Sequence, residues 1–147
     1  MTGSESTADE LVYTRVFAAP RPLVFACMTE PGHLAHFWGP KGMTTPVEGI
    51  TVDLRPGGVF RTVMVNDADG SRFTMTAEYL TVRPPELLVW HDPESGVTTS
   101  TTFTAVDESH TEVEIRQSNV PAAFRRPENR AGFATSLDRF VEYVATL

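Results

Sequence analysis

The chain has little of what several common classes of protein require. It contains a single cysteine, Cys27, which excludes an intramolecular disulfide and favours a reducing compartment. The neighbours of Cys27 are apolar, so we expect a buried thiol that fills space rather than a reactive one. Lys41 is the sole lysine, and the formal net charge is −7 at pH 7. This argues against a nucleic-acid surface, because phosphates are bound by clustered lysine and arginine.

Long hydrophobic runs are missing too. No stretch approaches the roughly 18 consecutive apolar residues that a membrane-spanning helix needs, so we expect no insertion into a membrane. Residues 1–9 are small, polar and acidic, without the basic and apolar regions of a secretory signal. We therefore expect a flexible N-terminal tail over residues 1–9, a single domain over residues 10–147, and a soluble protein of the cytoplasm.

Motifs for nucleophilic catalysis and for cofactors are absent as well. The sequence has no Gly-x-Ser-x-Gly motif, and residues 39–42 lack the Gly-Lys-Ser/Thr ending of a phosphate-binding loop. His33 and His36 are three residues apart on a predicted helix, a spacing that two metal ligands can use. A third ligand is missing from their surroundings in the sequence. We therefore expect neither a cofactor nor a metal ion.

What the chain does have is a regular succession of segments separated by turn residues. Residues 11–18 are rich in β-branched and aromatic side chains and predict a first strand, after which two prolines open a short helix over residues 21–28. Thr29 can cap a helix and predicts a second short helix over residues 30–37. Further strands are predicted over residues 47–54, 58–65, 71–82, 87–92, 97–106 and 110–118.

The spacing of apolar side chains indicates how these elements pack. Residues 72–79 alternate between apolar and polar, which predicts an antiparallel sheet with one dry face. Residues 128–146 instead repeat apolar side chains at helical spacing. The predicted fold is α+β, a curved antiparallel sheet of about six to seven strands around a long C-terminal helix, with two short helices after the first strand.

Three short motifs indicate a family. Residues 38–40 (Trp-Gly-Pro) mark a corner after the short helices, and residues 56–58 (Pro-Gly-Gly) predict a tight reversal between two strands, with a positive φ at Gly58. Residues 83–86 (Arg-Pro-Pro-Glu) interrupt two later strands. In this order the segments resemble the SRPBCC superfamily, also called START-like, helix-grip or Bet v1-like proteins, and within it bacterial proteins similar to a domain of Hsp90 ATPase activators. The resemblance covers residues 10–146.

This resemblance implies an apolar cavity between the sheet and the last helix. The side chains predicted to point inward mix large apolar groups with small polar ones, which leaves room for a ligand and provides hydrogen-bond partners. The alternative is an ordinary packed core. We expect the cavity to bind a small hydrophobic or aromatic molecule without catalysis. The predicted pocket residues are Trp38, Phe60, Thr62, Met64, Met75, Tyr79, Trp90, Thr101, Phe103, Gln117, Phe133, Leu137 and Phe140.

Other functions remain open at this point. The superfamily also contains enzymes similar to polyketide cyclases and dehydratases, and for such an enzyme Tyr79, His91 and Gln117 would be the polar candidates. The resemblance to activators of the Hsp90 ATPase also implies a chaperone as a partner. Edge strands such as residues 11–18 or 47–54 would allow pairing in a homodimer.

Overall fold

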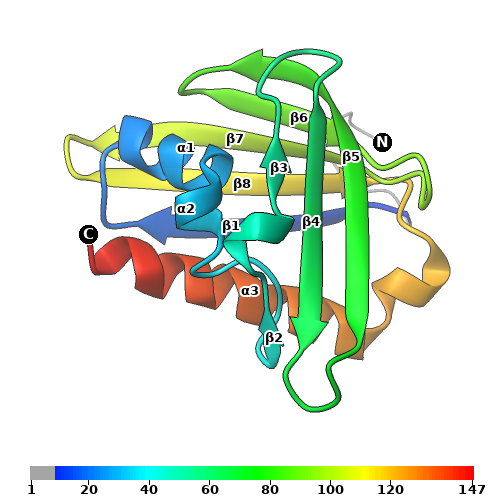
Figure 1. The fold of residues 1–147 in the computed structure, drawn as a ribbon. Helices are drawn as coiled ribbons and strands as arrows, with labels where there is room; N and C mark the ends of the chain where they lie inside the picture. Colours follow the sequence, from blue (N-terminus) through cyan, green and yellow to red (C-terminus); the bar gives the residue numbers. More distant parts are fainter. Residues whose placement is uncertain (1–8) are drawn as a thin grey trace.

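The computed structural model of the protein describes residues 9–147 and shows a sheet bent around one long helix (Figure 1). The sheet has eight antiparallel strands in the order β1-β8-β7-β6-β5-β4-β2, and β3 also pairs with β4. This is the α+β helix-grip architecture that the sequence predicted. The predicted tail, apart from Asp9, lies outside the described residues. The elements are β1 (Leu11–Phe17), α1 (Arg21–Thr29), α2 (Pro31–Leu34), β2 (Met43–Thr44), η1 (Val47–Gly49), β3 (Thr51–Val52), β4 (Val59–Asn66), β5 (Arg72–Arg83), β6 (Leu87–His91), β7 (Thr98–Asp107), β8 (His110–Ser118), η2 (Ala122–Arg125) and α3 (Pro127–Ala145).

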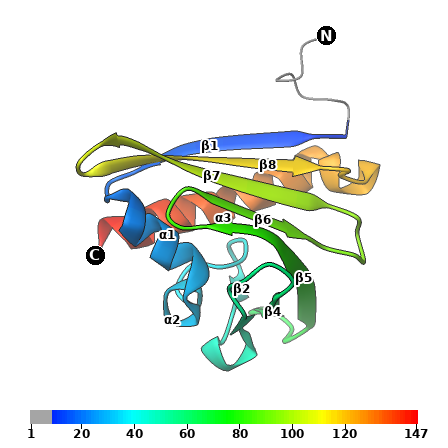
Figure 2. The same ribbon diagram turned by 90° about the horizontal axis from the view of Figure 1, so that it is seen from above.

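The curvature of the sheet creates a concave side, which Figure 2 shows from above. Within β5 the predicted alternation holds from Met75 to Tyr79, and the cross-strand partners Phe60 of β4 and Ala77 of β5 are both buried. The pairing of β5 with β6 shifts between Tyr79 and Thr81, and this irregularity leaves Leu80 about half exposed on the outer side. Such a bulge bends a strand and increases its twist, so it contributes to the concave shape.

The helix α3 lies along the concave side, close to β1 (Figures 1 and 2). Its buried face packs against aromatic rings, because the Phe140 ring stacks on Phe37 with centroids 4.1 Å apart and contacts Phe17 at 4.4 Å. Pro127 occupies the first turn, where its missing N–H leaves no bond unmade. Within the described residues, neither α3 nor another helix is long and apolar enough to cross a membrane.

The two short helices follow β1 as predicted, but their boundary differs. The Thr29 side chain does not cap α2, because Thr29 is the last residue of α1 and its hydroxyl donates to the Phe25 carbonyl at 3.0 Å. Glu30 occupies the cap position of α2 and makes no side-chain hydrogen bond there. The helix α2 ends at Leu34, and residues 35–37 form a turn instead of continuing the helix.

The strand predicted over residues 47–54 is mostly wrong. A turn of 3₁₀ helix, η1, replaces its first part, since the Gly49 amide donates to the Pro46 carbonyl at 3.0 Å. Only β3, two residues long, remains as a strand, and β2 was not predicted. Proline favours the start of such a turn because its φ is fixed near the helical value and it has no amide hydrogen to pair.

The Pro-Gly-Gly reversal joins β3 to β4 as predicted, but the positive φ falls on the other glycine. Gly57 has a φ of 83°, whereas Gly58 does not adopt a positive φ. Gly58 is required for a different reason, because a Cβ atom there would lie 1.9 Å from the Asp53 carbonyl oxygen. Gly57 therefore allows the backbone conformation of the turn, and Gly58 allows the Asp53 carbonyl to approach closely.

Candidate functional site

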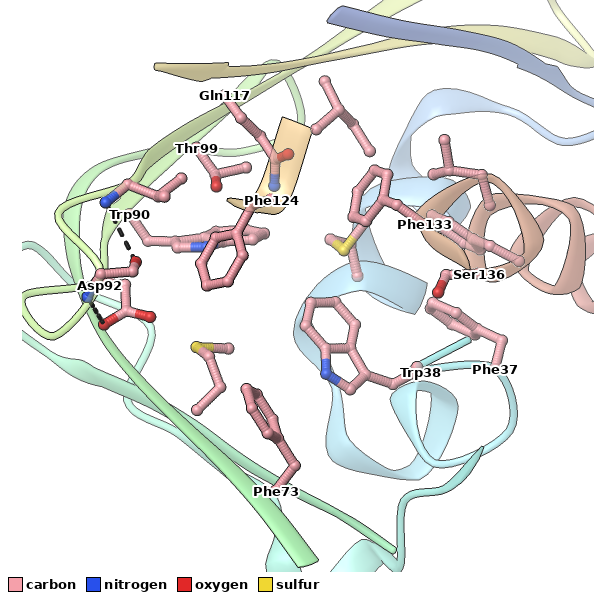
Figure 3. Close-up of a pocket in the computed structure, with 18 of the residues that line it drawn as sticks. Phe37, Trp38, Phe73, Trp90, Asp92, Thr99, Gln117, Phe124, Phe133 and Ser136 are labelled. Carbon is pink, nitrogen blue, oxygen red and sulfur yellow. Dashed lines mark hydrogen bonds between the residues drawn. The ribbon is translucent and has the colours of Figure 1, made fainter. Parts of the chain in front are cut away.

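A cavity of about 490 Å³ lies between α3 and the concave side of the sheet (Figure 3). This volume is within the range of about 300–1,000 Å³ that is usual for small-molecule sites. Its wall is formed by the end of α1, by the corner after α2, by strands β5 to β8 with the turn between β6 and β7, by η2 and by α3. Seven of the predicted pocket residues line it, namely Trp38, Met75, Trp90, Gln117, Phe133, Leu137 and Phe140.

Trp38 is held rigidly at one side of the cavity. Its indole Nε1 donates to the Thr62 hydroxyl at 3.1 Å, and its carbonyl accepts from the Thr45 hydroxyl at 2.8 Å. Arg139 of α3 then fixes the following residues, since its Nη1 donates to the Gly39 carbonyl at 2.8 Å and to the Pro40 carbonyl at 3.0 Å. The N–H of Trp38 is thus already bonded, and what this residue offers a ligand is the apolar surface of its ring.

Trp90 lies beside Trp38 in the cavity wall, and a buried ring supports both indoles. Phe60 makes edge contacts with Trp38 at 5.2 Å and with Trp90 at 5.1 Å between ring centroids. Phe60 is fully buried and does not line the cavity. Its place in the core fixes the separation of the two indoles, whose centroids are 6.4 Å apart.

The remaining predicted pocket residues also lie outside the wall of the cavity. Phe103 packs against Phe25 of α1 at 5.2 Å, because α1 covers that part of the concave side. Met64 lies against the corner at Gly39. The sheet therefore has the predicted inward face, but side chains and the short helices fill part of the space above it. The predicted pocket residues that do not line the cavity are Phe60, Thr62, Met64, Tyr79, Thr101 and Phe103.

The polar candidates for an enzyme are not brought together. Tyr79 is fully buried, burial raises the pKa of its hydroxyl, and the hydroxyl has no hydrogen-bond partner within residues 9–147. His91 lies 2.9 Å from the Thr98 hydroxyl through its Nδ1 and is not part of the cavity wall. Of the three candidates, only Gln117 lines the cavity.

The histidine pair lies away from the cavity and contacts α3. The Nδ1 atom of His33 is 2.6 Å from the Tyr143 hydroxyl, and the His36 ring stacks on the Tyr143 ring at 4.8 Å. Within residues 9–147, no group of three or more His, Cys, Asp or Glu side chains is arranged to hold a metal ion.

Several residues of the wall were not predicted as pocket residues. Phe73 and Phe124 are about half exposed and mark the sides of the cavity that face solvent (Figure 3). Asp92 and Glu94 lie in the turn between β6 and β7. The alternation over residues 72–79 pointed to Phe73, whereas η2 and the turn have no periodic pattern from which a direction could be predicted. The others are Met28, Phe37, Gly39, Thr74, Ser95, Val97, Thr99, Ile115 and Ser136.

Comparison with known proteins agrees with this architecture. The family model described as "Activator of Hsp90 ATPase homolog 1-like protein" matches residues 18–145. A crystal structure from Chromobacterium violaceum is 24% identical, with a TM-score of 0.81 and coverage of 90% of this chain and 95% of that chain. One from Nitrosomonas europaea is 25% identical, with a TM-score of 0.81 and coverage of 96% and 97%. A solution structure of an AHSA1-like protein from Aeromonas hydrophila is 20% identical, with a TM-score of 0.81 and coverage of 93% and 92%. No curated protein matched the chain.

Proposed function

The chain belongs to the family of Activator of Hsp90 ATPase homolog 1-like proteins, within the SRPBCC superfamily, and from this premise we propose that it binds a small hydrophobic or aromatic molecule in the cavity between the sheet and α3. The binding requires no chemical step. The bound molecule lies against the rings of Trp38 and Trp90, which contact each other and form one aromatic part of the cavity wall.

The observation that supports this function most is the cavity itself. The cavity is partly open to solvent, so its largely apolar wall contacts water in the free protein, which is unfavourable. Here about 490 Å³ stays open because rigid groups hold its walls apart, among them the corner at Trp38 that Arg139 and Thr62 fix. An apolar ligand of matching size would remove this surface from water.

Filling the cavity from within tests the proposal. Met75 of β5 lines it, so Met75→Trp places an indole in the space that a ligand would occupy. We expect this variant to lose binding of N-phenyl-1-naphthylamine, a neutral apolar aromatic compound, in equilibrium dialysis. Native mass spectrometry of the freshly purified wild-type protein would show a bound apolar mass that is missing from the variant.

Leu80→Trp is the matched control for Met75→Trp. Leu80 is on the same strand but about half exposed on the outer side, so this variant gains the same side chain without entering the cavity. It should bind the aromatic compound as the wild type does. Equal binding by Met75→Trp and the wild type, with both proteins folded by circular dichroism, would contradict the proposed function.

A second function follows from the family description, which names an activator of the Hsp90 ATPase. If the protein is a chaperone cofactor, adding it to an Hsp90-type chaperone will raise the rate of ATP hydrolysis. Met75→Trp separates the two functions, because an activator surface outside the cavity would keep its effect in this variant. Loss of both properties together would instead indicate that ligand and chaperone act through the same site.

A further inference from the structure

The wall of the cavity is not uniform in charge. Within the described residues, the charged side chains that line it are Asp92 and Glu94, both of them carboxylates in the turn between β6 and β7. Neither forms an ion pair with a basic group of residues 9–147. The cavity therefore combines a largely apolar wall with negative charge at one place, and that charge is not compensated within the described chain.

Asp92 is fixed in position by its own turn. One carboxylate oxygen, Oδ1, accepts from the Glu94 amide at 2.9 Å and from the Ser95 amide at 3.4 Å. The other oxygen, Oδ2, has no hydrogen-bond partner within residues 9–147. Asp92 is two residues after Trp90, and side chains two apart on an extended segment point to the same side. Asp92 and Trp90 both line the cavity.

A second, independent feature of the same wall points to a polar group on the ligand. Thr99 is only 5% exposed and lines the cavity, yet its hydroxyl has no hydrogen-bond partner within residues 9–147. The strand register places it directly between Trp90 of β6 and Gln117 of β8, whose amide also lines the cavity and has no side-chain bond. The Thr99 hydroxyl is not a fully buried atom, so it is open to the cavity and can accept a hydrogen bond from a ligand donor.

Aromatic rings near a carboxylate favour a positively charged group on the ligand. The faces of indole and phenyl rings attract cations, most strongly for tryptophan, and the attraction increases where water is excluded. Trp90 is next to Asp92 and Thr99 on the wall, so a cation there would meet a ring, a carboxylate and a hydroxyl acceptor together. An anion at the same place would face uncompensated negative charge.

We propose that the ligand is an amphiphilic cation, an apolar or aromatic body that carries a protonated amine at the end of the cavity formed by Asp92, Glu94 and Thr99. The apolar body lies toward Trp38 and α3. This inference rests on the proposed function, because it names the class of molecule that the same cavity binds.

A series of ligands with one alkyl chain and three head groups tests the inference. Decylammonium, decanol and decanoate are titrated into the wild-type protein by isothermal calorimetry at neutral pH, below the concentrations at which they form micelles. We expect decylammonium to bind roughly tenfold more tightly than decanol, and decanoate more weakly than both. The preference for decylammonium over decanol should shrink as salt is added, since the carboxylates lie near solvent.

Two double variants distinguish the effect of the wall carboxylates on binding from the effect of the protein's net charge. Asp92→Asn with Glu94→Gln removes both carboxylates from the wall and keeps an acceptor oxygen at residue 92 for the turn. Glu108→Gln with Glu112→Gln removes the same amount of charge from exposed positions at the far end of β7 and β8. The first variant should bind decylammonium no more tightly than decanol, and the second should keep the wild-type preference.

The outcomes distinguish the two proposals. If none of the three compounds binds, the proposed function fails. If decanol binds but decanoate binds as well as or better than decylammonium, the cavity binds apolar ligands and the inference about their charge is wrong. The inference is also wrong if the distant variant loses the preference as fully as the Asp92 and Glu94 variant. Unchanged decanol binding in both variants shows that the cavity has kept its shape.

Discussion

Gly57 and Gly58 are neighbours that lack a side chain for different physical reasons. Gly57 adopts a positive φ of 83° with open space around it, so Gly57→Ala should cost only the strain of that conformation, about 1 kcal/mol. Gly58→Ala should cost more than about 2 kcal/mol, because the new Cβ would overlap the Asp53 carbonyl oxygen and force the turn apart. Urea denaturation of the two variants measures this difference. Equal losses of stability would show that the turn relaxes easily.

The sequence identified the importance of Trp38 but not how the residue acts. A tryptophan beside Gly-Pro at the end of two short helices indicates a corner, and the family resemblance placed that corner at a cavity. The hydrogen bond from its indole to Thr62 could not be predicted, because the two residues are 24 positions apart and belong to different elements. Thr62 was predicted as a ligand contact and instead positions Trp38.

Arg139 joins α3 to the corner that follows α2. Its guanidinium reaches the Gly39, Pro40 and Met43 carbonyls, which would otherwise have no partner from α3. Arg139→Met keeps much of the apolar stem and removes these hydrogen bonds. We expect the free energy of unfolding to fall by about 1–3 kcal/mol, together with weaker ligand binding as Trp38 loosens.

Asp138→Asn is the control for the loss of Arg139. Asp138 is the preceding residue of α3, its side chain is 64% exposed, and its contact with Arg15 is 3.6 Å long. This variant should change stability by less than about 0.5 kcal/mol, because exposed ion pairs contribute little. A loss as large as that of Arg139→Met, measured by the same denaturation, would contradict the role of the carbonyl contacts.

The elements that the sequence predicted well are those with a long periodic pattern. Residues 128–146 repeat apolar side chains at helical spacing, and α3 covers nearly the same range. The segment over residues 47–54 is rich in β-branched residues but short, and Pro46 with Gly49 directs it into a turn. Periodicity also shows which residues of a strand point to the inner face of the sheet, but not which of these residues a helix covers. For this reason Phe103 was predicted in the cavity and lies beneath α1.

Stability of the whole protein should decrease in alkaline solution. Burial raises the pKa of the Cys27 thiol from its ordinary value of 9.0 to about 11, with a smaller contribution from the Glu30 carboxylate, and burial also raises the pKa of Tyr79. Between pH 9 and pH 11 the folded state thus keeps a proton that the unfolded state has released, so the free energy of unfolding falls as pH rises.

Cys27→Ala measures the share of the thiol in this decrease. The variant should be less stable at pH 8, because it loses buried volume, yet its free energy of unfolding should fall less than that of the wild type between pH 9 and pH 11, by up to about 2 kcal/mol. Chemical denaturation at a series of pH values gives both curves. Parallel curves for the variant and the wild type would mean that the thiol of Cys27 ionises as readily in the folded protein.

The two neighbouring indoles in the cavity wall are also the complete tryptophan content of the chain. Ultraviolet emission excited at the red edge of protein absorption therefore originates beside the ligand space and nowhere else in the molecule. Binding of an apolar molecule will exclude water from the two chromophores and shift their emission to shorter wavelengths. The protein thus contains its own optical reporter of occupancy, which needs no label and no substitution.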